Sequence, residues 1–219
     1  MDTLKKTVNR LPCKIESTYG LVWGGVFSAF VSWILPFMAE RDVISLPAAL
    51  NTSIVFTAIG VACWFYFYYL FAVGCKPLQT KVSNYVMIFV YMYLLAAIVN
   101  IVAMACEVAW INSIGGIAGI IGLIYWIKTG NFLKKNYKGL LGETGAAMIR
   151  VMIYFLIVIV IAVFYGIFFA GFHNSETAFI ISTVIIIAIG LWLFAVSYVT
   201  IFARIIDMLE SGHVHGEID

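Results

Sequence analysis

The chain has 219 residues, of which 63% are hydrophobic and 11% are charged, and its formal net charge is +2. Soluble domains carry roughly 45–50% apolar and about 25% charged residues, so this chain lacks the polar side chains that would cover a soluble surface. Its mean hydropathy of +1.04 agrees with that conclusion. The composition therefore excludes a soluble domain, a disordered chain, a nucleic-acid-binding protein and a secreted disulfide scaffold, and it predicts an integral membrane protein.

Apolar stretches long enough to cross a bilayer recur along the chain, since a core of about 30 Å takes about 20 helical residues. We predict an all-α, polytopic membrane helical bundle with six transmembrane helices. The predicted spans cover about residues 20–38, 47–73, 84–105, 110–127, 147–170 and 177–203. They form a single transmembrane domain over residues 20–206, between a basic segment at 1–19 and an acidic, histidine-containing tail at 207–219.

The distribution of Lys and Arg predicts the orientation of the spans. With six spans, twelve of the thirteen basic residues fall on the side that holds both chain ends, and only Arg41 falls on the other side. Because basic flanks stay in the cytoplasm, we expect both termini there, in a plasma (inner) membrane. The first apolar stretch is longer than a signal-peptide core, so we interpret it as a retained anchor and expect no cleavable signal peptide.

Polar residues within the third and fourth spans form the first candidate site. Tyr93, Asn100 and Glu107 recur every seven residues and therefore share one face of the third span. Asn112 opens the fourth span, so Asn100, Glu107 and Asn112 are a candidate polar vestibule or cation site, because an ionisable residue at membrane depth is a functional candidate. The alternative interpretation is helix packing, with Glu107 in a turn that water reaches.

Small residues predict where helices pack closely. Gly115, Gly119 and Gly122 share a face of the fourth span and predict a close helix–helix contact. In the second span, Ser53, Thr57 and Gly60 share a face as well. The cytoplasmic half of that span, residues 64–71, is rich in aromatic side chains and predicts an aromatic belt at the membrane interface.

A short amphipathic helix is predicted between the fourth and fifth spans, over about residues 131–141. Its apolar face holds Leu133, Tyr137, Leu140 and Leu141, and its basic face holds Lys134, Lys135 and Lys138. Such a helix lies on the inner leaflet, where basic residues attract anionic lipids. A generic interfacial linker is the simpler interpretation, and a specific lipid or partner site is the sharper one.

The motifs of membrane-bound enzymes are missing from the sequence. No histidine lies within a predicted span, as haem ligation would need, and neither His-Glu-x-x-His nor Gly-x-Ser-x-Gly occurs. The four aspartates all lie outside the spans. We therefore expect no enzymatic activity, no cofactor and no metal site.

Two functional hypotheses follow. The first is a small channel or facilitative transport component that acts as an oligomer, as indicated by the polar and small faces of the second, third and fourth spans. The second is a structural, assembly or immunity-type subunit of a membrane complex, as indicated by the glycine face of the fourth span. Both imply the bilayer, anionic lipids of the inner leaflet, and a second copy or a membrane subunit as partners, and neither implies nucleic acid.

Overall fold

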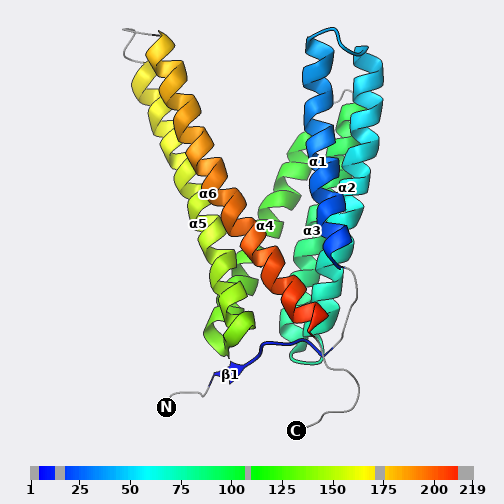
Figure 1. The fold of residues 1–219 in the computed structure, drawn as a ribbon, viewed down its shortest axis with the longest axis vertical. Coiled ribbons are helices and arrows are strands. Elements are labelled where there is room, and N and C mark those ends of the chain that lie inside the picture. Colours follow the sequence, from blue (N-terminus) through cyan, green and yellow to red (C-terminus); the bar gives the residue numbers. More distant parts are fainter. Residues whose placement is uncertain (1–4, 13–17, 107–109, 171–175, 212–219) are drawn as a thin grey trace. The chain divides into compact units, whose positions relative to one another are not determined.

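The computed structural model describes residues 5–12, 18–106, 110–170 and 176–211, and within them the fold is helical apart from two strands of two residues each. Six helices in this described part are long and apolar enough to cross a membrane, which confirms the predicted number of such helices (Figure 1). Their bounds are α1 (Thr18–Glu40), α2 (Leu46–Cys75), α3 (Thr80–Cys106), α4 (Ile111–Asn136), α5 (Gly139–Ala170) and α6 (Glu176–Glu210). The strands are β1 (Lys6–Thr7) and β2 (Tyr137–Lys138), which form a small parallel pair in a fold that otherwise agrees with the predicted all-α class.

The chain folds as two compact units. One contains residues 9–129 and 206–219, and so holds α1, α2, α3 and most of α4; we call it the four-helix unit. The other contains residues 1–8 and 130–205, and so holds β1, β2, α5 and most of α6; we call it the hairpin unit. Each unit has its own buried apolar residues, such as Phe67 and Phe71 in the first and Leu133 and Ile201 in the second.

In the four-helix unit, α1 and α2 lie side by side along much of their length (Figure 1). Small residues allow this contact, since a methyl group at Gly60 would lie 3.2 Å from the Ser28 Cβ. A methyl group at Gly25 would lie 2.7 Å from the Trp64 ring. In a membrane, an apolar side chain gains little by contacting another helix instead of lipid. Close approach of the two backbones therefore supplies the packing that holds the helices together.

An aromatic cluster joins α2, α3 and α4. The rings of Tyr68, Phe89 and Trp126 meet edge to face, with centroids 4.9 to 5.7 Å apart. Tyr68 and Trp126 are almost fully buried, and so are Phe67 and Phe71. The prediction that the whole of residues 64–71 forms an interfacial belt is therefore wrong: the segment is aromatic all round because one side packs inside the unit, while Tyr66 and Tyr69 are exposed.

In the hairpin unit, α4 turns into α5 through a tight corner. A methyl group at Gly145 would lie 2.6 Å from both the Leu133 Cβ and the Lys134 N. One at Gly130 would lie 3.0 Å from the carbonyl oxygen of Gly145, so the two backbones are almost in contact. Gly139 adopts a positive φ of 70°, which suits glycine and lets the chain reverse between the helices.

The separate amphipathic helix predicted at residues 131–141 is therefore absent, and that prediction is wrong. Instead α4 continues to Asn136, β2 follows, and α5 already begins at Gly139. Leu133, Tyr137 and Leu141 are buried, so their face packs within the protein and does not need an acyl chain. The segment does have an apolar and a basic face, but its apolar face packs against protein.

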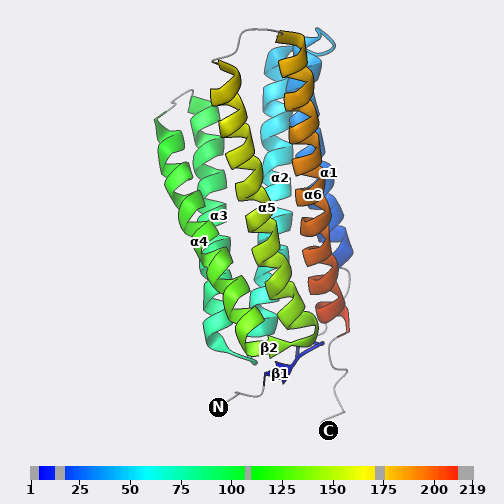
Figure 2. The same cartoon turned by 90° about the vertical axis from the view of Figure 1, so that its left-hand side faces the viewer.

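That partner includes the N-terminal segment, residues 5–12, which we call the strap. β1 pairs in parallel with β2, with Lys6 opposite Tyr137 and Thr7 opposite Lys138 (Figure 2). The Val8 amide donates to the Lys138 carbonyl at 3.1 Å, and the Leu141 amide donates to the Val8 carbonyl at 3.1 Å. Because the first amides of a helix have no partner within it, the strap satisfies a donor at the start of α5.

The strap also serves the ends of two other helices. The Lys5 ammonium donates to the Lys134 carbonyl, in the last turn of α4, at 3.2 Å. Within the four-helix unit, the Leu11 amide donates to the Met208 carbonyl near the end of α6 at 3.0 Å, and Leu11 is fully buried. A cation or an amide at a helix C-terminus is favourable because the last carbonyls are unpaired and carry partial negative charge.

The two helices of the hairpin unit lie side by side, with Gly190 of α6 facing Val158 of α5 (Figure 1). Arg204 pairs with Glu143 at 3.2 Å, although the Glu143 side chain is 60% exposed.

Candidate functional site

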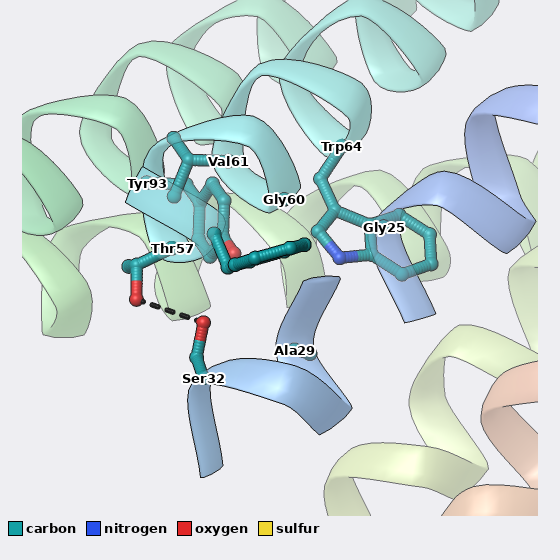
Figure 3. Close-up of a pocket in the computed structure, with 9 residues that line it drawn as sticks. Gly25, Ala29, Ser32, Thr57, Gly60, Val61, Trp64 and Tyr93 are labelled. Atoms are coloured by element: carbon teal, nitrogen blue, oxygen red, sulfur yellow. Dashed lines mark hydrogen bonds between the residues drawn. The ribbon is translucent and has the colours of Figure 1, made fainter. Parts of the chain in front are cut away.

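A pocket of about 110 Å³ opens between α1, α2 and α3 of the four-helix unit (Figure 3). Its lining combines small, aromatic and hydroxyl-bearing side chains: Gly25, Ala29, Ser32, Phe56, Thr57, Gly60, Val61, Trp64 and Tyr93. The volume is several times the roughly 10–15 Å³ that one water molecule needs. The pocket can therefore hold several waters or one molecule of a few heavy atoms.

The pocket lies at the middle of the helices that form it. Ala29 is the central residue of α1, and Tyr93 is the central residue of α3. Gly60 and Val61 are the two central residues of α2. Each of these helices is long and apolar enough to cross a bilayer, and the centre of a helix that crosses a bilayer lies at the depth of the hydrocarbon core.

A cluster of hydroxyl groups joins α1 to α2 at one side of the pocket. The Ser53 hydroxyl donates to the Ser32 carbonyl at 3.0 Å, and the Ser32 Oγ lies 3.3 Å from the Ser53 carbonyl oxygen. The Thr57 hydroxyl lies 3.1 Å from the Ser32 Oγ, and this contact is visible in Figure 3. The two helices are thus joined by polar contacts in both directions.

These hydroxyl groups have more acceptors within reach than hydrogens to donate. The Ser32 hydroxyl also reaches the Ser28 carbonyl at 2.8 Å, and the Thr57 hydroxyl reaches the Ser53 carbonyl at 2.8 Å. Each hydroxyl carries one hydrogen but two lone pairs. The pocket surface is mainly apolar, and the Ser32 and Thr57 hydroxyls are among its few polar groups, so the pocket suits a small molecule with apolar surface and a hydrogen-bonding group.

No ionisable acid or base lines the pocket besides the phenol of Tyr93, among the residues that the structure describes. A charged ligand at this depth would have no opposite charge to pair with, and an unpaired charge in a medium of low dielectric is costly. The site is therefore suited to a small uncharged molecule with hydrogen-bonding groups and some apolar surface.

The predicted vestibule lies partly outside the described residues. Glu107 is not among them, and Asn112 begins the first turn of α4 with a side chain that is likewise outside them. Asn100 is described, is exposed, and lies beside α4: a methyl group at Gly115 would come within 2.6 Å of the Asn100 Oδ1. The vestibule itself stays a prediction, with Asn100 placed at the contact between α3 and α4.

The three glycines predicted to pack closely differ in their surroundings. A methyl group at Gly122 would lie 3.5 Å from the Met92 Cβ, so Gly115 and Gly122 both face α3. Around Gly119, no described atom lies within 4 Å of where a methyl group would stand, and the same holds for Gly116. Helix α4 therefore approaches α3 closely at two positions, Gly115 and Gly122, which lie two turns apart.

The three lysines predicted to contact lipid are all exposed. Lys134 and Lys135 lie in the last turn of α4, and Lys138 lies in β2. The sequence reasoning missed their neighbour, the strap, which brings further lysines to the same corner.

The sequence reasoning also missed the contribution of α1 to the pocket. The spacing of Thr57 and Gly60 predicts that they share one face of the second span, and the structure shows that this face packs on α1. The signal was available, because Gly25, Ala29 and Ser32 recur at intervals of four and three residues, which is one helix face. Small residues at helical spacing in two consecutive apolar spans predict that those spans pack on each other.

Comparison with known proteins finds no matching family model, no matching curated protein and no matching solved structure.

Proposed function

We propose that the protein is a non-enzymatic facilitative transport component, or small channel, that acts as an oligomer and passes a small uncharged polar solute. The observation that carries this proposal is a mainly apolar pocket, formed by the central residues of α1, α2 and α3, that has the hydroxyl groups of Ser32 and Thr57 in its lining. A solute that crosses the hydrocarbon core loses its hydrogen bonds to water, and the pocket offers replacements where that loss is greatest.

The chemistry of the pocket supports a specific class of solute. The hydroxyl groups of Ser32 and Thr57 favour a molecule with a hydrogen-bonding group, and the small volume favours a molecule of a few heavy atoms. Ammonia, urea and short polyols belong to this class. The distribution of basic residues supports a cytoplasmic location of both termini, and this orientation is part of the proposal.

The test is solute flux into proteoliposomes that contain the purified full-length protein. We expect at least one small uncharged solute to equilibrate faster than into empty liposomes, with no comparable flux of inorganic ions. The variant Ala29→Leu places a larger side chain in the pocket and should reduce the flux to the background rate. Its matched control is Ala62→Leu, because Ala62 is also exposed and lies on α2 without lining the pocket.

Two outcomes would contradict this proposal. One is the absence of flux for every small uncharged solute in liposomes shown to contain folded protein. The other is an equal effect of Ala29→Leu and Ala62→Leu, which would mean that the pocket has no part in the flux.

A second candidate function is a structural or assembly subunit, favoured by the open space around Gly116 and Gly119 on α4. That space admits a helix of another chain, and small residues are what close helix contacts in membranes require. If this is the function, Gly119→Leu should abolish association with the partner or second copy and leave the monomer stable, as seen by light scattering in detergent. Gly115→Leu should instead destabilise the contact between α3 and α4 in the monomer. Gly119→Leu without any effect on association would count against it.

A further inference from the structure

Five exposed lysines from distant parts of the sequence gather at the corner between α4 and α5, and we call them the lysine surface. They are Lys5, Lys6, Lys134, Lys135 and Lys138. The pairing of β1 with β2 sets Lys6 opposite Tyr137, next to Lys138, and neighbouring strands lie about 4.8 Å apart. The Lys5 ammonium reaches the Lys134 carbonyl at 3.2 Å across 129 residues of sequence.

The backbone fixes the position of this surface. The hydrogen bonds from the Val8 amide to Lys138 and from the Leu141 amide to Val8 hold the strap against the corner. Val8 is almost fully buried, which anchors the strap by its side chain as well. The lysines of the strap therefore stay beside those of α4 and β2, and are not simply attached to a free chain end.

Acidic side chains do little to neutralise the lysine surface. Among the described residues of the hairpin unit, the acids are Glu143 and Glu176. The Glu143 carboxylate is paired with Arg204, and Glu176 begins α6, 34 residues before the end of that helix at Glu210. Among the described residues of this unit, five positive charges thus share one corner and the acid nearest to it in sequence is already paired. Phosphate is the natural counterion for such a cluster of ammonium groups.

The corner is also at the level of lipid headgroups. Helix α4 has 26 residues, which span about 39 Å at 1.5 Å per residue and exceed a hydrocarbon core of about 30 Å. The charges of Lys134 and Lys135 in its last turn favour that end as the one outside the core. Leu133 and Leu141 are buried in the protein and offer no apolar anchor at this point. The surface is therefore suited to the charged headgroup of a lipid and not to its acyl chain.

We propose that the lysine surface binds the phosphate of an anionic phospholipid headgroup, and that the strap is part of the site. This goes beyond the transport proposal and does not depend on it. The site then takes its lysines from two segments of the chain. Lys134, Lys135 and Lys138 come from α4 and β2, and Lys5 and Lys6 come from the strap. Detaching the strap should therefore weaken lipid binding even when every lysine is kept.

The experiment counts lipids bound to the purified full-length protein in a neutral detergent by native mass spectrometry, with phosphatidylglycerol titrated against phosphatidylcholine. We expect preferential binding of phosphatidylglycerol. Since a basic residue near an anionic membrane surface contributes about 1 kcal/mol, or about fivefold, the double variant Lys5→Gln/Lys6→Gln should weaken that binding roughly 25-fold. The matched control is Lys76→Gln/Lys81→Gln, which removes two exposed lysines of the four-helix unit and should leave the preference unchanged.

A third variant separates position from charge. Val8→Asn keeps all five lysines and the net charge, but it places a polar group where the strap is buried. We expect it to weaken phosphatidylglycerol binding while the circular dichroism spectrum keeps its helical signal. The proposal is overturned if the strap and control double variants weaken binding equally, or if Val8→Asn has no effect. It is also overturned if inorganic phosphate at low millimolar concentration displaces the lipid, because the site would then be one for a soluble anion.

Discussion

The contact between α1 and α2 and the corner between α4 and α5 both use small residues, but in different ways. At the first contact, hydroxyl side chains of Ser32, Ser53 and Thr57 join the helices and a pocket lies beside them. At the corner, Gly130 and Gly145 bring the two backbones almost into contact. Side chains that bridge a gap leave room for a ligand, whereas backbones in contact leave none. The comparison indicates that the first region is suited to binding and the second to holding the fold.

The largest effect is expected at the corner. In Gly145→Leu, the new Cβ would lie 2.6 Å from the Lys134 N and 2.7 Å from the Gly130 carbonyl oxygen, and backbone atoms cannot move aside as a flexible side chain can. We expect a loss of about 3 kcal/mol or more in the free energy of unfolding. The measurement is unfolding in mixed detergent micelles. Gly119→Leu is the control, since no described atom surrounds Gly119, and equal losses in the two variants would remove the distinction between the regions.

A smaller effect is expected at the hydroxyl cluster. Thr57→Val keeps the shape of the side chain and removes the hydroxyl that contacts Ser32 and the Ser53 carbonyl. Polar contacts between helices in membranes average about 0.6 kcal/mol and reach about 1.7, so the loss in unfolding free energy should lie in that range. Thr200→Val is the matched control, because the Thr200 hydroxyl bonds only within its own helix, to the Val196 carbonyl, among the contacts described. A loss above 3 kcal/mol for Thr57→Val would show that this contact is as rigid as the corner.

The smallest effect is expected at the ion pair of the hairpin unit. Glu143→Gln removes the charged partner of Arg204, whose side chain is 21% exposed, but the Glu143 side chain is 60% exposed, so water reaches the pair and screens it. Exposed ion pairs contribute about 0 to 1 kcal/mol, so unfolding of this variant should differ little from that of the wild type. If Glu143→Gln lowered the free energy of unfolding as much as Gly145→Leu, the ion pair would contribute as much to the stability of the corner as the glycine contacts do.

The spans could be predicted from the sequence because crossing a bilayer imposes a length and an apolar composition on each helix separately. The ends of α4 and α5 could not, because they depend on a partner far away in the chain. Residues 131–141 show two faces in the sequence, but only the structure shows that the strap and the corner bury the apolar one. The spacing of residues along one segment predicts which of them share a helix face, but it does not predict which part of the protein packs on that face.

The candidate site was predicted only in part for a similar reason. The sequence of the second span predicts that Thr57 and Gly60 share one face. It does not predict their contact with Ser32, because the sequence of one helix does not determine which helix packs against it. Gly145 illustrates the opposite case: a glycine near the start of a helix reads as a weak helix former, and its role in backbone contact appears only when Lys134 is placed against it. Glu107, the most conspicuous acid in the sequence, lies outside the described residues.

The central claim, that a small solute occupies the pocket at mid-membrane depth, is tested most directly by protection of a cysteine placed in it. Ala29→Cys, in proteoliposomes, is labelled with N-ethylmaleimide, and the modification of this residue and of the native Cys106 is followed by mass spectrometry. Ala29 lines the pocket, whereas Cys106 is exposed at the end of α3 and serves as the control. With the solute that gives the fastest flux, labelling of Ala29→Cys should slow as the solute concentration rises, while labelling of Cys106 should not change. Equal labelling rates at Ala29→Cys with and without that solute would contradict the claim.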